Sequence, residues 1–264
     1  MTKPVAFAIA AHPDDIELMM GGTLALLGQA GYELHYMNVA NGSVGTDRED
    51  RDAIVARRTA EARAAAHTLG ATFHEPLTDD LEIFYTDDLL RRLTAIVRQA
   101  KPSVLLTQSP QDYMEDHVNC QRLAVSAAFN RGMRNYRSIP PAEPYLDEVT
   151  VYHALPWGLR DPLRKRVRPE MFVDVTPTLD LKRAALACHR SQKEWLDVSQ
   201  GLDSYLVTMT DMSRAVGAMS GRFEYAEGWR RHLHLGYCPE HANPLRDALG
   251  DRLAISEEYL ATLE

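Results

Sequence analysis

Short apolar runs alternate with helix-like segments through the first half of the chain, and this alternation is the strongest constraint on its fold. The apolar runs have the length and composition of buried strands, and they cover residues 5–11, 34–39, 72–74 and 103–107. Helical patterns follow at residues 22–30, 53–69, 87–99 and 117–131. Strand–helix repetition of this kind predicts a parallel sheet with right-handed crossovers.

The second half of the chain is less regular. A proline-rich stretch at residues 137–144 has the composition of a surface loop. Beyond it we expect strands at 148–152 and 171–175, and helices at 177–200, 203–219 and 243–264. No repeat or linker divides the 264 residues. We therefore expect one α/β domain, a mostly parallel sheet flanked by helices with a C-terminal α/β elaboration.

Two loops that carry histidine and aspartate are predicted to meet. The first, His12-Pro13-Asp14-Asp15, directly follows the first predicted strand, and the second, 109–117, follows the fourth. In the commonest doubly wound order, the first and fourth strands lie side by side where the strand order reverses. The loops at their carboxyl ends are therefore expected to be neighbours, although they lie far apart in the sequence.

The two loops together supply a ligand set for one divalent metal ion. His12, Asp15 and His117 would leave a fourth coordination position open, as in catalytic zinc sites. A water bound there has its pKa lowered toward about 7, and Asp14 could accept its proton. These residues predict metal-assisted attack of water on a carbonyl group. Iron, cobalt or manganese would also accept two imidazoles and one carboxylate.

Other interpretations of the same residues are open. Asp112 or Asp116 could hold a ligand imidazole in the required tautomer. The segment 12–15 could instead be only a turn, because proline and aspartate favour turns and aspartate caps helices. His117 could be a structural residue at a helix start. Their joint position, at the ends of two adjacent strands, favours the metal site.

These motifs resemble those of the PIG-L/LmbE-like family of zinc-dependent de-N-acetylases. The resemblance covers roughly residues 4–130 and rests on Ala-His-Pro-Asp-Asp at 11–15, Gly-Gly-Thr-Leu-Ala at 21–25, an Arg-x-x-Glu helix at 58–61 and Pro-x-Asp-x-x-x-Asp-His at 110–117. It implies a Rossmann-like fold and removal of acetyl groups from N-acetylglucosamine units.

Carried over residue by residue, the family implies that His12, Asp15 and His117 bind one zinc ion per chain and that Asp14 is the general base. The metal site then falls in a Rossmann-like half, residues 1–135. The divergent half, residues 136–264, is expected to select the substrate.

Two positions of the first half bear on substrate contact. Arg58 matches a position that contacts substrate in relatives, and a surface ion pair with Glu61 is the alternative. Met114 stands where the family usually has a histidine that stabilises the oxyanion or protonates the leaving amine. A thioether can donate no proton. Either zinc alone polarises the amide or another group supplies this function.

Histidines of the second half could supply the missing group, although single histidines of this kind are more often structural or exposed. The candidates are His153, His189, His232, His234 and His241. We favour the stretch 229–234 because rings and cations are dense there, with His232 and His234 as catalytic residues and Trp229 as a substrate contact. A second stretch, 192–201, has aromatic and polar groups suited to sugar contact, or is a helix with a core-facing tryptophan.

Net charge and cysteine content limit the kinds of binding partner and compartment that we expect. The net charge of −8 argues against nucleic acid or an anionic membrane as the main partner. Three dispersed cysteines suggest no disulfide framework. The N-terminus lacks a leader-like pattern, and no run approaches about 18 apolar residues. We expect a cytoplasmic protein without membrane insertion, and by resemblance a homo-oligomer.

The leading hypothesis is a zinc hydrolase that removes the N-acetyl group from an N-acetylglucosamine-type amino sugar or its conjugate. An amidase of a sugar–thiol conjugate would keep the metal and change the scissile amide. A catalytically degenerate, metal- or sugar-binding Rossmann-like module is the third possibility, which the methionine at position 114 keeps open. Against a nucleotide-binding module, no Gly-x-Gly-x-x-Gly follows the first strand.

Overall fold

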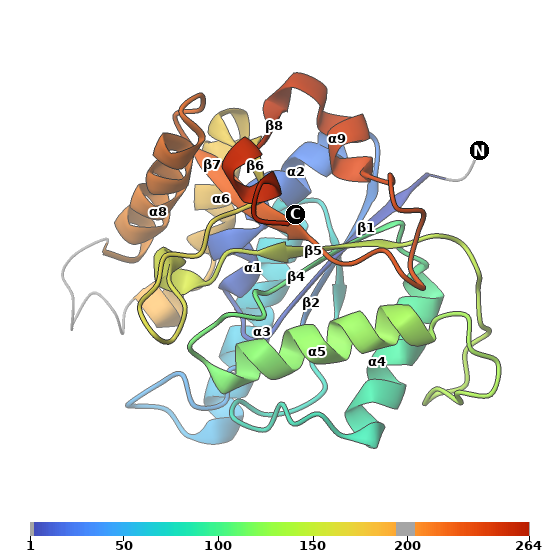
Figure 1. Ribbon diagram of the computed structural model, residues 1–264. Helices are drawn as coiled ribbons and strands as arrows, with labels where there is room; N and C mark the ends of the chain where they lie inside the picture. The colour runs from blue at the N-terminus through green and yellow to red at the C-terminus, as the bar shows by residue number, and fades with distance from the viewer. Residues whose placement is uncertain (1–2, 194–203, 264) are drawn as a thin grey trace.

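A single mixed sheet forms the centre of the protein in the computed structural model, which describes residues 3–193 and 204–263. Within these residues the sheet has eight strands in the order β3-β2-β1-β4-β5-β7-β6-β8 (Figure 1). The strands are β1 Val5–Ala10, β2 Glu33–Asn38, β3 Thr72–His74, β4 Val104–Thr107, β5 Thr150–Ala154, β6 Met171–Asp174, β7 Ala226–Arg231 and β8 Leu253–Ile255.

Strand directions divide the sheet into two parts. The pairs β3–β2, β2–β1, β1–β4 and β4–β5 are all parallel. The pairs β5–β7, β7–β6 and β6–β8 are antiparallel. The prediction of a mostly parallel α/β fold with a C-terminal elaboration is confirmed. The adjacency of the first and fourth strands is also confirmed, because Ile9 of β1 pairs with Thr107 of β4.

Helices cover both faces of the sheet. One face carries α1 Asp15–Met19, α2 Gly21–Gln29, α3 Arg51–Thr68, α6 Leu179–Leu186 and α9 Pro244–Leu249. The other carries α4 Asp87–Ala100 and α5 Glu115–Asn130 (Figure 1). Helix α8, Ser204–Ser220, packs against β7, and α10, Glu257–Leu260, lies near the C-terminus.

Alternation along β1 explains this layering. Ala6, Ala8 and Ala10 join the apolar cluster under α1, α2 and α3. Phe7 and Ile9 join the cluster under α4 and α5. Successive side chains of a strand point to opposite faces, so a run that is apolar at every position must be covered on both sides.

Three expectations for the second half are wrong. The helix predicted at 177–200 is interrupted, because α6 ends at Leu186 and helical structure resumes at residues 190–193; residues 194–200 lie outside the described part of the chain. The helix predicted at 243–264 is broken by β8, which pairs with β6. Strand β7 was not predicted, because Ala-Glu-Gly-Trp-Arg-Arg has neither an apolar run nor β-branched residues.

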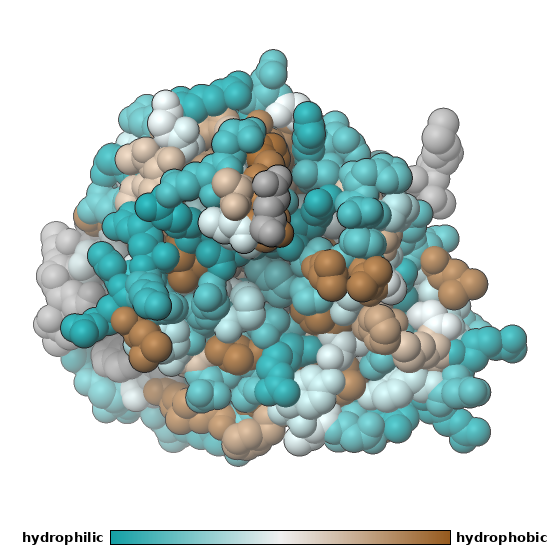
Figure 2. All heavy atoms as spheres, in the orientation of Figure 1, coloured by the Kyte–Doolittle hydropathy of each residue, from teal (hydrophilic) through white to brown (hydrophobic). Residues whose placement is uncertain are grey.

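No helix within residues 3–193 and 204–263 is long and apolar enough to span a bilayer. On the face drawn in Figure 2, apolar residues lie in separate small groups among hydrophilic ones.

Candidate active site

The predicted convergence of the two loops occurs at the carboxyl ends of β1 and β4. His12 lies just beyond β1, Asp15 is the first residue of α1, and His117 lies in the first turn of α5. Between them Asp14 has a φ of 108°, in the region that favours glycine. A non-glycine residue held there is strained, and such strain is concentrated at functional sites.

Three side chains, His12, Asp15 and His117, form what we call the metal corner. Nδ1 of His12 lies 3.3 Å from Nε2 of His117 and 3.5 Å from Oδ2 of Asp15. Nε2 of His117 lies 3.4 Å from Oδ1 of Asp15. A tetrahedral ion with bonds of about 2.0–2.1 Å separates its ligand atoms by about 3.3–3.4 Å. The spacing and the donor types therefore fit a divalent metal ion such as zinc.

Each imidazole of the metal corner has a carboxylate at its other nitrogen. Nε2 of His12 is hydrogen-bonded to Oδ2 of Asp116 at 2.9 Å. Nδ1 of His117 lies 3.0 Å from Oδ1 of Asp112. Asp116 thus contacts the histidine of the other loop rather than its neighbour in sequence. A carboxylate in this position fixes the tautomer and the ring orientation of a metal-binding histidine.

Gln108, which the sequence did not single out, fixes the third member of the corner. Its Nε2 donates to Oδ2 of Asp15 at 3.0 Å, and its Oε1 accepts from the main-chain N–H of Ala11 at 2.9 Å. The main-chain N–H of His12 donates to the same Asp15 oxygen at 2.7 Å. These bonds leave Oδ1 of Asp15 directed toward His117.

The electrostatics of the corner favour cations. Burial alone would lower the pKa of His12, but the Asp116 and Asp15 carboxylates raise it from 6.5 to about 10. Burial also opposes protonation of His117, yet Asp15 and Asp112 raise its pKa. Despite its burial, Asp15 has a pKa well below the usual range because both histidines face it. Metal binding in place of these protons would release them.

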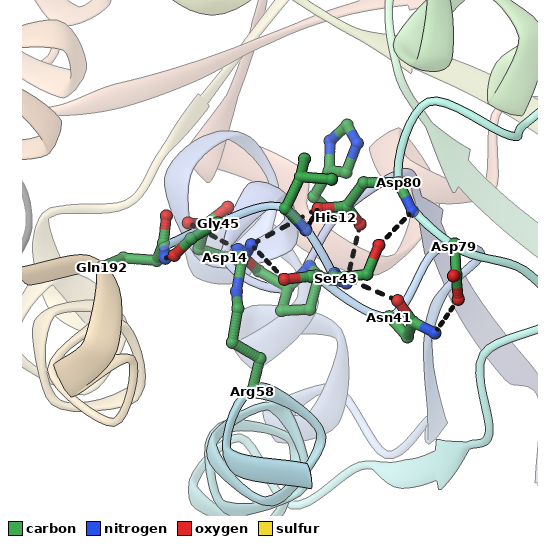
Figure 3. Close-up of polar contacts among 12 residues, drawn as sticks. His12, Asp14, Asn41, Ser43, Gly45, Arg58, Asp79, Asp80 and Gln192 are labelled. Atoms are coloured by element: carbon green, nitrogen blue, oxygen red, sulfur yellow. Dashed lines mark hydrogen bonds and ion pairs between the residues drawn. The ribbon is translucent and has the colours of Figure 1, made fainter. Parts of the chain in front are cut away.

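Asp14 lies beside the corner, with Arg58 as its cation. Nη2 of Arg58 lies 3.6 Å from Oδ2 of Asp14 and donates to the Pro13 carbonyl at 2.8 Å. Burial raises the pKa of Asp14, and Arg58 opposes that shift. In Figure 3, Arg58 extends from α3 toward Asp14 and the loop at residues 41–45. The arginine is 3% exposed, so its guanidinium mainly contacts groups of the protein itself.

The loop 41–45 encloses the Arg58 guanidinium. Gly42 has a φ of 83°, and a side chain at Gly42 or Gly45 would collide with the arginine. Asp80 holds this loop by accepting from the N–H of Gly42 at 2.7 Å, and Nε2 of Gln192 donates to the Gly45 carbonyl at 2.9 Å (Figure 3). Residues from the loop after β3 and from the second half of the chain therefore complete the surroundings of Arg58.

A cavity of about 420 Å³ opens onto the metal corner. Besides the corner, its walls include Asp14, Arg58, Met114 and several apolar side chains from both halves. Tyr205 of α8 also lines it, and burial raises the pKa of its hydroxyl, with the Asp14 charge adding to the shift. Neither Tyr205 nor Gln108 carries a motif, so only the folded arrangement brings them to notice.

Three predicted site residues of the second half lie away from the cavity lining. Trp229 is fully buried, and its indole N–H donates to Oγ1 of Thr23 at 2.9 Å, so it belongs to the core. His232 and His234 do not line the cavity. Trp229 is buried because residues 226–231 form an inner strand, β7, which is held between β5 and β6, and His232 and His234 follow the end of this strand.

The alternative histidines do not reach the cavity either. His153, His189 and His241 are not among its lining residues. His153 instead links His232 to the site region, because Nε2 lies 3.0 Å from Nδ1 of His232 and Nδ1 lies 2.9 Å from the Gln108 carbonyl. The sugar-contact prediction at 192–201 reaches the cavity at Gln192, and residues 194–201 lie outside the described residues.

Known proteins resemble this chain in sequence and in fold. Residues 7–128 match the model of the PIG-L family, described as GlcNAc-PI de-N-acetylase. Diacetylchitobiose deacetylase of Thermococcus kodakarensis is 28% identical over 243 residues, which cover 88% of this chain and 85% of that protein.

Two solved structures resemble most of the chain at 25% identity. 4-Carboxy-2-hydroxymuconate hydratase of Pseudomonas putida has a TM-score of 0.73 and matches over 86% of this chain and 95% of its own. N,N'-diacetylchitobiose deacetylase of Pyrococcus horikoshii has a TM-score of 0.72, with coverage of 91% and 88%. The fold thus occurs with both a deacetylase and a hydratase activity.

Proposed function

Because the chain belongs to the PIG-L/LmbE-like family, we propose that it is a metal-dependent hydrolase that removes the N-acetyl group from an N-acetylglucosamine-type amino sugar or its conjugate. The observation that carries the proposal is the 3.3–3.5 Å spacing of the ligand atoms of His12, Asp15 and His117. In this proposal residues 1–135 hold the metal and residues 136–264 help to select the substrate.

The metal corner would hold one zinc ion per chain, or another divalent metal. A bound ion would supply a water of lowered pKa and an electrophile for the acetamide carbonyl. His12 would bind through Nδ1 and His117 through Nε2, because their other nitrogens face Asp116 and Asp112. Gln108 would hold Asp15 in its ligand orientation.

Asp14 would act as the general base. Burial raises the pKa of Asp14, which favours proton uptake, while the Arg58 charge opposes this shift and favours the carboxylate form. The Asp14 carboxylate faces Arg58, whereas that of the adjacent ligand Asp15 faces His117. The proton that Asp14 accepts from water can then pass to the leaving amine. Met114, which lines the cavity, can supply no proton of its own.

Acetate release tests this function. Purified protein loaded with zinc is expected to release acetate from at least one N-acetylglucosamine derivative, to stop after chelation and to recover when zinc is added back. Release of a larger acyl group from a sugar–thiol conjugate would replace the deacetylase by the amidase. Bound zinc without turnover on any amide would favour the degenerate binding module.

A further inference from the structure

Three exposed side chains surround the entrance of the cavity, and we call them the apolar mouth. They are Val44, Leu81 and Tyr113, which are 55%, 65% and 54% exposed. Each comes from a different loop, after β2, β3 and β4 respectively. Apolar side chains that line a concave entrance, rather than lying singly on the surface, indicate contact with a ligand.

Leu81 in particular is held in place at a cost. Its φ of 65° lies in the left-handed region, which disfavours a large side chain. Its main-chain N–H donates to Oδ2 of Asp116 at 2.7 Å, and the same oxygen contacts His12. The loop that presents Leu81 is thus tied to the metal corner.

The inner wall continues this apolar character. Leu18 and Met19 of α1, and Leu155 and Trp157 after β5, line the same cavity, as does Met114. The cavity therefore combines the polar metal corner with an apolar part of its lining, to which Gln192, Tyr205 and Thr208 add polar groups. A ligand with one polar, reacting end and one apolar end would match it.

The cavity has no cation to spare for an acidic ligand. Among the described residues that line it, Arg58 is the one arginine or lysine, and it lies against Asp14, Asp80 and main-chain carbonyls. Residues 194–203, which lie outside the described residues, contain no lysine, arginine or histidine. A carboxylate or phosphate on the ligand would lose hydration without gaining a partner.

We infer that the group attached to the amino sugar is uncharged and apolar, an alkyl or aryl aglycone that contacts the apolar mouth. This inference rests on the proposed deacetylase function and adds its substrate class. It also separates the chain from the hydratase that shares its fold, because a carboxy-hydroxymuconate carries several carboxylates.

Three glycosides of N-acetylglucosamine with the same anomeric configuration test the inference: hexyl, methyl and malyl. With zinc-loaded enzyme, kcat/KM for acetate release is expected to be at least about tenfold higher for the hexyl than for the methyl glycoside, and lowest for the malyl glycoside. A double variant, V44S/L81S, should remove most of the hexyl preference. The matched control L163S, at a residue that is 78% exposed and does not line the cavity, should keep it.

The outcomes are distinct. Equal values for the hexyl and methyl glycosides, or the highest value for the malyl glycoside, would overturn the inference and leave the deacetylase function intact. Failure to release acetate from all three would remove the proposed function, and the inference with it. Calorimetric titration of the Asp14→Asn variant with the hexyl glycoside gives a second readout, since binding weaker than that of the malyl glycoside would contradict the inference without requiring turnover.

Discussion

The metal corner and the apolar mouth lie in one cavity but are stabilised differently. Every side chain of the corner has a second partner that fixes it: Asp116 for His12, Gln108 for Asp15 and Asp112 for His117. The mouth consists of side chains that are more than half exposed. The loops that carry Val44 and Leu81 are held by main-chain N–H groups, and the Tyr113 ring packs edge-on against His117. The comparison shows that the side chains of the corner are held in one geometry, whereas those of the mouth can adapt to a ligand. Substitutions in the corner should therefore reduce activity far more than substitutions in the mouth.

Loss of a corner ligand should have the largest effect. His117→Ala removes one of three ligand atoms and leaves the buried Asp15 carboxylate without its His117 partner. We expect metal content after dialysis to fall close to zero and kcat/KM for acetate release to fall by on the order of 10³-fold or more. Metal analysis with the activity assay checks this. Full zinc content in the variant would mean that the corner is not the metal site.

Asp14→Asn should separate proton transfer from metal binding. The amide keeps the shape of the side chain but cannot accept a proton, so kcat should fall about 10²–10⁴-fold while metal content is unchanged. Asp79→Asn is the matched control, since Asp79 binds Asn41 and Arg51 away from the corner. If Asp14→Asn retained wild-type kcat, another residue would have to be the base.

His153 joins the two halves, so its titration should reveal how strongly they depend on each other. Burial lowers its pKa from 6.5 to about 4, which means that the unfolded chain takes up a proton before the folded protein does. Its contribution to stability is therefore complete above pH 6.5 and is lost as the pH falls toward 4. Between pH 7.5 and 5 this contribution should decrease by about 2 kcal/mol.

Urea unfolding at pH 7.5 and 5 measures that decrease. His153→Gln should lessen the pH dependence of the free energy of unfolding, whereas the exposed His241→Gln should not. His74, whose pKa is also lowered to about 4 by burial, will leave some pH dependence in both variants. The same slope in wild type and His153→Gln would show that His153 is protonated without cost.

Gln108→Leu should weaken the corner without removing a ligand. Leucine can neither donate to Asp15 nor accept from the Ala11 N–H. Metal affinity is expected to fall about 10–100-fold, the usual cost of losing a hydrogen bond behind a metal ligand. Gln111→Leu, in the same loop and bonded to Arg230, serves as the control. Equal metal affinity in the two variants would mean that the backbone alone, without Gln108, orients Asp15.

The corner could be predicted from sequence because local patterns specify it. Strand and helix periodicity placed His12 and His117 after the first and fourth strands. The doubly wound order predicted that these two strands are neighbours, as they are in the structure. The pairing of each histidine with its carboxylate was not predictable. Asp116 contacts His12 of the other loop and not His117, its neighbour in the sequence. Gln108 likewise became relevant only once β1 and β4 were paired.

The mouth and the second half were not predictable for a different reason. Strand β7 has a buried Trp229 beside charged residues, so its pattern matches a surface segment as well as a strand. The composition after this strand favoured His232 and His234 as catalytic residues. The direction of a strand, however, decides which side chains reach a cavity. That direction depends on β5 and β6, which lie far away in the sequence.

The smallest effects are expected at the residues that composition favoured most. His234→Ala should change kcat/KM by less than about twofold, because His234 does not line the cavity. His232→Ala should also preserve turnover, but it removes the partner of His153 Nε2, so a modest loss of stability is expected at neutral pH. A thousandfold loss of activity in either variant, with metal content and stability unchanged, would mean that a segment outside the corner takes part in the chemistry, and the contrast between corner and mouth would have to be redrawn.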